Sequence, residues 1–137
     1  MAVRILTTLD LSNFDTSKLD SMWCMFLNCE NLTSLDLSSF DTSKVKNMYS
    51  MFENCYNLTE LDLSSFDTSK VENMRNMFWG CENLTTIKGI IDMKSCTEKY
   101  ERMFTNCPKL KGVKIKNPPA NFENASGLSK YQYTIVS

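Results

Sequence analysis

The chain has 137 residues, 42% of them hydrophobic and 23% charged, and its fifteen basic and sixteen acidic side chains leave a net charge of −1. This composition predicts one folded domain, residues 1–137, and the balanced charge disfavours nucleic acid and anionic membranes as partners. The sequence has no histidine, the commonest general base and metal ligand, so we expect no catalysis, no metal and no cofactor. No apolar stretch is long enough to cross a membrane, and residues 1–6 are too short for a signal peptide.

A repeat with a period of 26 residues organises the chain. The segment from Leu32 to Lys44 recurs almost unchanged from Leu58 to Lys70. The period predicts four units, at 6–31, 32–57, 58–83 and 84–109, followed by a last strand and a C-terminal cap at 110–137. Aligned units form apolar columns: Leu9, Leu35, Leu61, Ile87 and Val113; Met25, Met51, Met77 and Met103; Phe26, Phe52, Phe78 and Phe104; Cys29, Cys55, Cys81 and Cys107.

Each unit divides into two halves with different periodicities. Leu32, Leu35 and Leu37 have the alternation of a short strand. Asp41 can then cap a helix, whose apolar face would consist of Val45, Met48, Met51, Phe52 and Cys55. Residues that tolerate a left-handed conformation mark the end of each helix, at Asn28, Asn54, Gly80 and Asn106. The predicted fold is therefore α/β: a leucine-rich-repeat solenoid of right-handed coils, each with one short parallel β-strand and one helix.

The end of the chain departs from the repeat. Ile87 to Met93 replaces the usual strand and corner, so we expect a reshaped corner there. Asn117-Pro-Pro119 cannot continue a regular ladder, and Tyr131 to Val136 predicts a terminal strand within the cap.

The pattern L-x-x-L-D-L-S-S-F-D-T-S-K-V, from Leu32, followed by N-M-x-x-M-F-x-N-C-x-N-L, from Asn47, resembles the BspA-like leucine-rich repeats of bacterial surface proteins. The resemblance extends from Leu6 to about Ile115. It implies a protein-binding module that adheres to host or matrix proteins, and it implies no catalytic residues. It also implies a location at the cell surface, or secretion, as part of a larger protein.

The residues between the inward leucines should face the concave surface of the sheet. We expect the ligand site there, at Asp10, Asp36, Asp62, Glu60, Ser34, Ser38 and Ser64. Stacked carboxylates would meet a basic partner or, less favourably, calcium. Alternatively, solvent, Lys88 and the hydroxyls of Ser12, Ser38 and Ser64 satisfy the carboxylates without any ligand.

The methionine and phenylalanine columns are expected to form the core rather than a recognition groove. The cysteine column is expected to hold buried free thiols, because helices would separate successive coils by roughly 10 Å, beyond disulfide reach. Cys24 and Cys96 lie off this column and are the expected exposed or reactive positions. Zinc is disfavoured because the sequence has no C-x-x-C motif.

Trp23 and Tyr49 align one unit apart, off the predicted inward face, and are interface candidates; lateral packing between helices is the alternative. Acidic residues predominate in 1–87 and basic residues in 88–137, and the first strand has an open edge. These features lead to the hypothesis of a homodimer through an open end of the solenoid. The leading function is a non-catalytic protein-binding module. The alternative is an intracellular structural scaffold or a self-assembling repeat protein.

Overall fold

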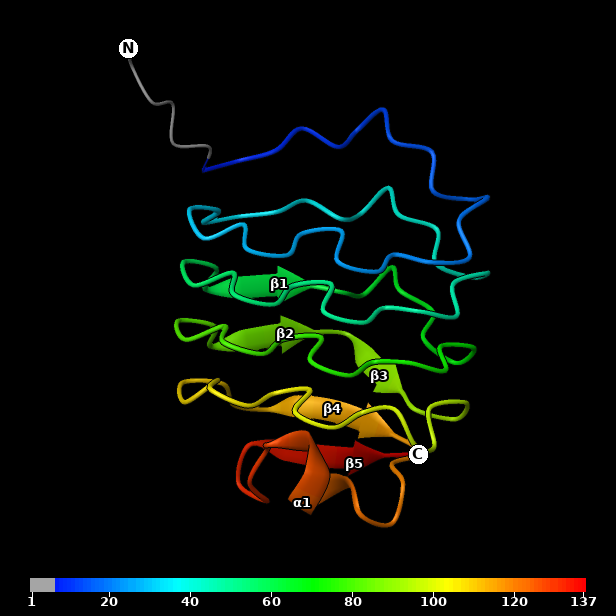
Figure 1. The fold of residues 1–137 in the computed structure, drawn as a ribbon, viewed down its shortest axis with the longest axis vertical. Helices are drawn as coiled ribbons and strands as arrows, with labels where there is room; N and C mark the ends of the chain where they lie inside the picture. Colours follow the sequence, from blue (N-terminus) through cyan, green and yellow to red (C-terminus); the bar gives the residue numbers. More distant parts are fainter. Residues whose placement is uncertain (1–6) are drawn as a thin grey trace.

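The computed structural model describes residues 7–137, so Leu6, where the first predicted unit begins, lies outside the described residues. The chain winds through a stack of coils from its N-terminal to its C-terminal end (Figure 1). Within the described residues the regular elements are β1 (Glu60–Asp62), β2 (Thr86–Lys88), β3 (Ile90–Asp92), β4 (Val113–Lys116), α1 (Phe122–Ser126) and β5 (Tyr133–Val136). No helix among these residues has the length and apolar character needed to span a membrane.

The strands form two small parallel sheets. In the first, β1 pairs with β2, and Leu61 lies opposite Ile87 at the distance of one repeat. The second has the order β3-β4-β5. On another side of the stack, parallel bridges join Ser21 to Asn47, Asn47 to Asn73 and Asn73 to Lys99. Neighbouring coils are therefore hydrogen-bonded to one another on more than one side.

The predicted helix of each unit is wrong. The residues involved form a turn segment in each coil, at 21–29, 47–55, 73–81 and 99–107, where the N–H groups have two alternating uses. The N–H groups of Met48 and Ser50 donate to Asn73 O and Arg75 O in the next coil (2.9 and 3.0 Å), whereas that of Met51 donates to Met48 O (3.2 Å). The only helix in the described part of the chain is α1, which lies in the cap.

Left-handed residues explain why these segments do not become helical. Asn28, Asn54, Gly80 and Asn106 have positive φ, as expected from their residue types. A second set that the sequence did not indicate, Cys24, Ser50, Asn76 and Arg102, also has positive φ. A left-handed residue every four positions along the turn segments is incompatible with a right-handed helix. The prediction of a leucine-rich-repeat solenoid with one strand and one helix per unit is therefore wrong.

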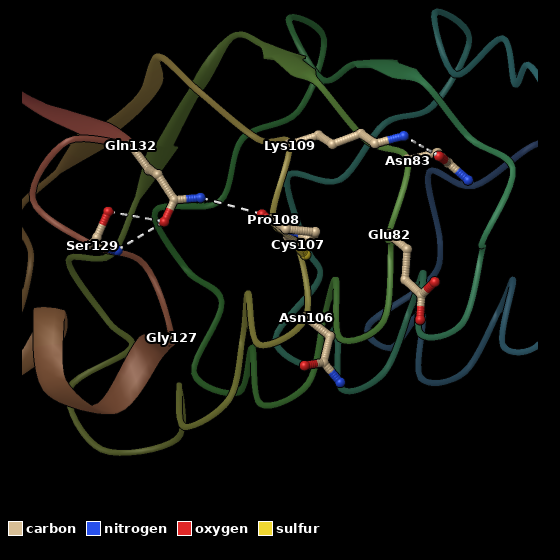
Figure 2. Close-up of a pocket in the computed structure, with 9 residues that line it drawn as sticks. All are labelled: Glu82, Asn83, Asn106, Cys107, Pro108, Lys109, Gly127, Ser129 and Gln132. Atoms are coloured by element: carbon tan, nitrogen blue, oxygen red, sulfur yellow. Dashed lines mark hydrogen bonds between the residues drawn. The ribbon is translucent and has the colours of Figure 1, made fainter.

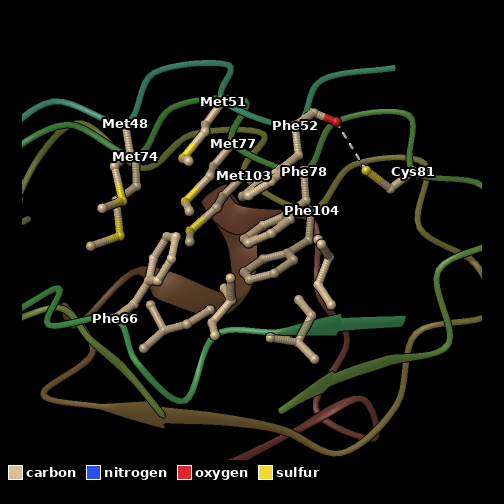
Figure 3. Packing of buried hydrophobic residues seen from close by; sticks show 14 of the residues in the cluster. Met48, Met51, Phe52, Phe66, Met74, Met77, Phe78, Cys81, Met103 and Phe104 are labelled. Carbon is tan, nitrogen blue, oxygen red and sulfur yellow. Dashed lines mark hydrogen bonds between the residues drawn. The ribbon is translucent and has the colours of Figure 1, made fainter. Parts of the chain in front are cut away.

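Side chains stacked in register fill the interior (Figure 3). The rings of Phe26, Phe52, Phe78 and Phe104 stack nearly parallel, with centroids 5.5, 5.5 and 5.2 Å apart. Met51, Met77 and Met103 are fully buried, and Met25 in the first coil is partly buried. The prediction that these columns form the core rather than a recognition groove is confirmed.

The C-terminal cap replaces a further coil. The N–H groups of Arg102 and Phe104 donate to the carbonyls of Ala125 and Ser126, at the end of α1 (2.8 and 2.7 Å). Gly127 has φ +86° and lies so close to Thr105 that a Cβ would be 2.8 Å from its backbone nitrogen. The predicted terminal strand is confirmed as β5, and β3 occupies the corner that was expected to be reshaped.

Candidate binding surface

The aspartates of the predicted concave face belong to tight turns. Asp36 Oδ1 accepts the N–H of Ser38 (3.0 Å) and Asp62 Oδ1 that of Ser64 (2.9 Å). The same turn recurs at Asp10, Asp15, Asp41 and Asp67, each with the serine two residues later. Hydrogen bonds to these serines lower the pKa of all six carboxyls. Backbone N–H groups of the serines therefore bind the carboxylates of Asp36 and Asp62, and at Asp10 the Ser12 hydroxyl also donates (2.7 Å), as the alternative interpretation expected of the hydroxyls.

These side chains nevertheless lie together on the surface, where Asp10, Asp36 and Asp62 form an acidic strip. All three are exposed. A hollow of about 350 Å³ is bordered by Asp36, Ser38, Asp62 and Ser64, and a smaller one of about 140 Å³ by Asp10, Ser12 and Asp36. Within residues 7–137 no group of three or more carboxylates and cysteines is placed to hold a metal ion.

Glu60 and Ser34 occupy the next outward column of the strand side, and both are exposed. The Glu60 carboxylate lies 2.9 Å from the Lys88 ammonium, which raises the pKa of Lys88. The nearby Asp62 carboxylate raises the pKa of Lys88 further. The acidic character of this side thus ends in the fourth coil, where a lysine neutralises it.

Trp23 and Tyr49 belong to a lateral column that continues as Arg75 and Glu101. Trp23 is 62% exposed and Tyr49 is half-buried. The Arg75 guanidinium lies 2.9 Å from the Glu101 carboxylate, which raises the pKa of Arg75 and lowers that of Glu101. Tyr49, Arg75 and Glu101 line a hollow of about 510 Å³. This column therefore places aromatic and charged groups side by side on the surface.

The cysteines are all free, but not for the predicted reason. Without helices, the stacked rings of successive coils have centroids 5.2 to 5.5 Å apart, instead of the roughly 10 Å expected between helix axes. The thiols of Cys55, Cys81 and Cys107 instead donate to the carbonyls of Phe26, Phe52 and Phe78 (3.2, 3.1 and 3.0 Å). Burial raises the pKa of Cys55 and Cys107 to about 12. Protonated thiols of this kind are poor nucleophiles.

The prediction for the two cysteines outside this column is only half right. Cys24 is partly exposed, whereas Cys96 is fully buried and its thiol donates to Lys99 O (3.2 Å). Burial raises the pKa of Cys96 to about 11. Cys96 is therefore neither exposed nor reactive.

A further hollow, beside the cap, was not predicted. It measures about 850 Å³ and lies between the last coil and the cap (Figure 2). Its lining includes Glu82, Asn83, Asn106, Cys107, Pro108, Lys109, Gly127, Ser129 and Gln132. The Gln132 amide donates to Cys107 O and Leu110 O (3.2 and 3.0 Å), and its oxygen accepts from Ser129. The only sequence signal for it was the end of the repeat at Asn117-Pro-Pro119.

Stacked 26-residue coils with a uniform core and two polar outer surfaces define a helix-poor repeat protein. A family model described as "Mycoplasma protein of unknown function, DUF285" matches residues 2–117, and the chain belongs to this family. The resemblance to BspA-like leucine-rich repeats is therefore wrong, because the matching family is a different one and the coils lack the helical half. No curated protein and no solved structure matches the chain.

Proposed function

We propose that the chain is a non-catalytic protein-binding module. The observation that carries this proposal is that two columns of the turn segments differ in how much their residue type varies from coil to coil. Facing inward, the same ring recurs as Phe26, Phe52, Phe78 and Phe104, whereas the lateral column changes at every coil, from Trp23 to Tyr49, Arg75 and Glu101. A scaffold with a repeated phenylalanine core and a variable lateral column suits recognition of an extended partner.

The lateral column is the best candidate for the contact surface. Tryptophan, tyrosine and arginine are the residue types that dominate the binding energy of protein interfaces. Trp23, Tyr49 and Arg75 occupy successive coils, and Tyr49 and Arg75 line one hollow. A partner segment lying along the stack would contact them in sequence.

The strand side is a second candidate surface, supported by the exposed acidic strip and its two hollows. Because each Asp of the strip already holds a turn, its uniformity has a structural explanation that does not need a ligand. Adhesion to host or matrix proteins stays a prediction, which the binding experiment below tests. Surface location and the alternative scaffold role stay predictions.

Binding of the purified chain to immobilised extracellular-matrix and plasma proteins, with salt and calcium varied, tests the proposal. We expect saturable binding to at least one of them. The double variant Trp23→Ala, Arg75→Ala should weaken it at least about tenfold, since losing one hot-spot residue commonly costs more than 1 kcal/mol. The matched variant Asp36→Asn, Asp62→Asn keeps the turns and should bind normally.

Two results would count against this assignment. If the asparagine variant loses binding and the alanine variant keeps it, the contact surface is the strand side. If no protein binds saturably, the protein-binding function is wrong for this class of partner, and the scaffold alternative gains support.

A further inference from the structure

The two ends of the stack differ in how their backbone groups are used. At the C-terminal end, α1 supplies carbonyls to the turn segment of the last coil, at Arg102 and Phe104. At the N-terminal end, the carbonyls of Ser21, Trp23 and Met25 accept no hydrogen bond from any residue in the described range. Their counterparts in the second coil, such as Asn47 and Tyr49, each accept one. Among the described residues, the turn segment of the first coil therefore has free carbonyl groups, whereas that of the last coil is covered by the cap.

Side-chain exposure follows the same asymmetry. Phe14 is 57% exposed, whereas its counterpart one coil later, Phe40, is 3% exposed and stacks on Phe66. Leu27, also in the first coil, is a further exposed large hydrophobic residue. The first coil thus exposes Phe14 to solvent, whereas the equivalent phenylalanine of the second coil is buried.

Within residues 7–137, the strand side of the stack has an unpaired edge at each end. β5 is the last strand of its sheet and pairs only with β4 in the described chain. Val113 N–H donates to Gln132 O (3.0 Å), and Val113 lies opposite Tyr133. The backbone N–H and C=O groups of Gln132 and Thr134 therefore point toward β4. By the alternation of a parallel strand, Tyr133 and Ile135 direct their backbone groups to the open edge. The Ile135 side chain is 65% exposed.

The first coil offers the complementary edge. Thr33 N–H donates to Thr7 O (3.0 Å), so the second coil lies along one edge of residues 7–11. No residue of another coil in the described range hydrogen-bonds to the opposite edge. Since all paired strands are parallel, a strand placed there in the same direction would continue the sheet.

The charges of the two ends are opposite. Residues 7–31 contain four acidic side chains and one lysine, whereas residues 109–137 contain five lysines and one glutamate. Contact between two N-terminal ends would bring like charges together, while contact between opposite ends would pair them.

We propose that the chain self-associates head to tail, with β5 of one copy pairing in parallel with residues 7–11 of the next. The proposed occupant of each open end is thus a second copy of this chain. Such a contact joins two different surfaces, so it does not close at a dimer and generates an open series of oligomers. The proposal is independent of the protein-binding function, because it uses the ends of the stack and not the lateral column.

Sedimentation velocity of the purified chain over a range of concentrations tests the assembly. The weight-average mass should rise continuously beyond the dimer and fall when salt screens the charges. The variant Ile135→Pro removes a donor on the open edge of β5 while keeping the bonds to β4, and it should stay monomeric. Ile135→Glu, which places a negative charge on β5 opposite the acidic N-terminal end, serves if the proline variant unfolds.

A charge exchange distinguishes the direction of assembly. Asp20→Lys, Glu30→Lys gives the N-terminal end a net positive charge, like the C-terminal end, and should abolish association. Separately, Lys111→Glu, Lys114→Glu, Lys130→Glu gives the C-terminal end a net negative charge, like the N-terminal end, and should also abolish it. Mixing the two variants should restore masses beyond the dimer. A strictly monomeric chain, a closed dimer, or assembly unaffected by the changes at Ile135 would each overturn the proposal.

Discussion

The strand side and the turn segments of a coil both bury apolar side chains and hydrogen-bond to the next coil, but their backbone conformations differ. Around Leu61, extended residues alternate between core and solvent and pair with the next coil. Around Phe78, N–H groups alternate between the next coil and a carbonyl three residues back. The turn segment therefore has apolar residues at spacings of three and four, like a helix, yet it has the inter-coil bonding of a sheet. Apolar spacing alone cannot distinguish the two.

The largest expected loss of stability comes from removing a side chain from the core that both sides of the coil share. Phe78→Ala removes a fully buried ring stacked between Phe52 and Phe104 and should lower the free energy of unfolding by about 3–5 kcal/mol. Leu61→Ala, on the strand side, should cost about 2–5 kcal/mol. Urea unfolding measures both. If Phe78→Ala cost far less than Leu61→Ala, the turn segments would not be part of the cooperative core.

The sequence predicted the repeat, the inward columns and the left-handed ends of the turn segments, because these depend on residue type at a fixed period. It failed for the turn segments, because a helix and a turn segment have the same spacing of apolar residues. Ser50 and Asn76 were assigned to helix, although nothing in their neighbours excludes positive φ. The missing signal was weak helix propensity: Ser50, Asn54 and Asn76 favour local turns.

Corner threonines, also unpredicted, link the strand side to the next coil. The buried Thr42 hydroxyl accepts Asp67 N–H (2.8 Å) and donates to Asp67 O (3.1 Å). Thr42→Val keeps the shape but leaves that N–H without a partner, which should cost about 1–3 kcal/mol in chemical unfolding. The exposed Thr85, which donates to Thr59 O, provides the control: Thr85→Val should change stability by less than about 0.5 kcal/mol. Equal effects would contradict the role of burial.

Asn76 distinguishes the turn segment from a helix directly. At φ +56°, and with a buried side-chain oxygen that has no partner, Asn76 should be replaced most easily by glycine. Asn76→Ala should destabilise the protein by about 1 kcal/mol relative to Asn76→Gly, because Cβ is unfavourable in the left-handed region. In a helix the order would be reversed, since alanine is the best helix former. Thermal unfolding of the two variants therefore tests the backbone assignment by its sign.

The smallest effect concerns pH and compares the two kinds of turn residue. The strand side uses Asp for turns, whereas the turn segments use Asn47 and Asn73, which accept the N–H groups of Tyr49 and Arg75 (3.0 and 3.2 Å). Only the aspartates titrate. Because their folded pKa values lie below the usual 3.8, their contribution to stability is present above that pH and is lost as pH falls through the lowered values.

Urea midpoints measured from neutral pH down to about 2 should therefore be steady to about pH 4 and then decline. Replacing the six turn aspartates by asparagine, which makes the same turn at Asn47, should flatten the decline and leave the neutral-pH midpoint nearly unchanged. An unchanged acid decline in that variant would mean that other carboxylates control it. Glu101, whose pKa Arg75 lowers, would then be the next group to replace.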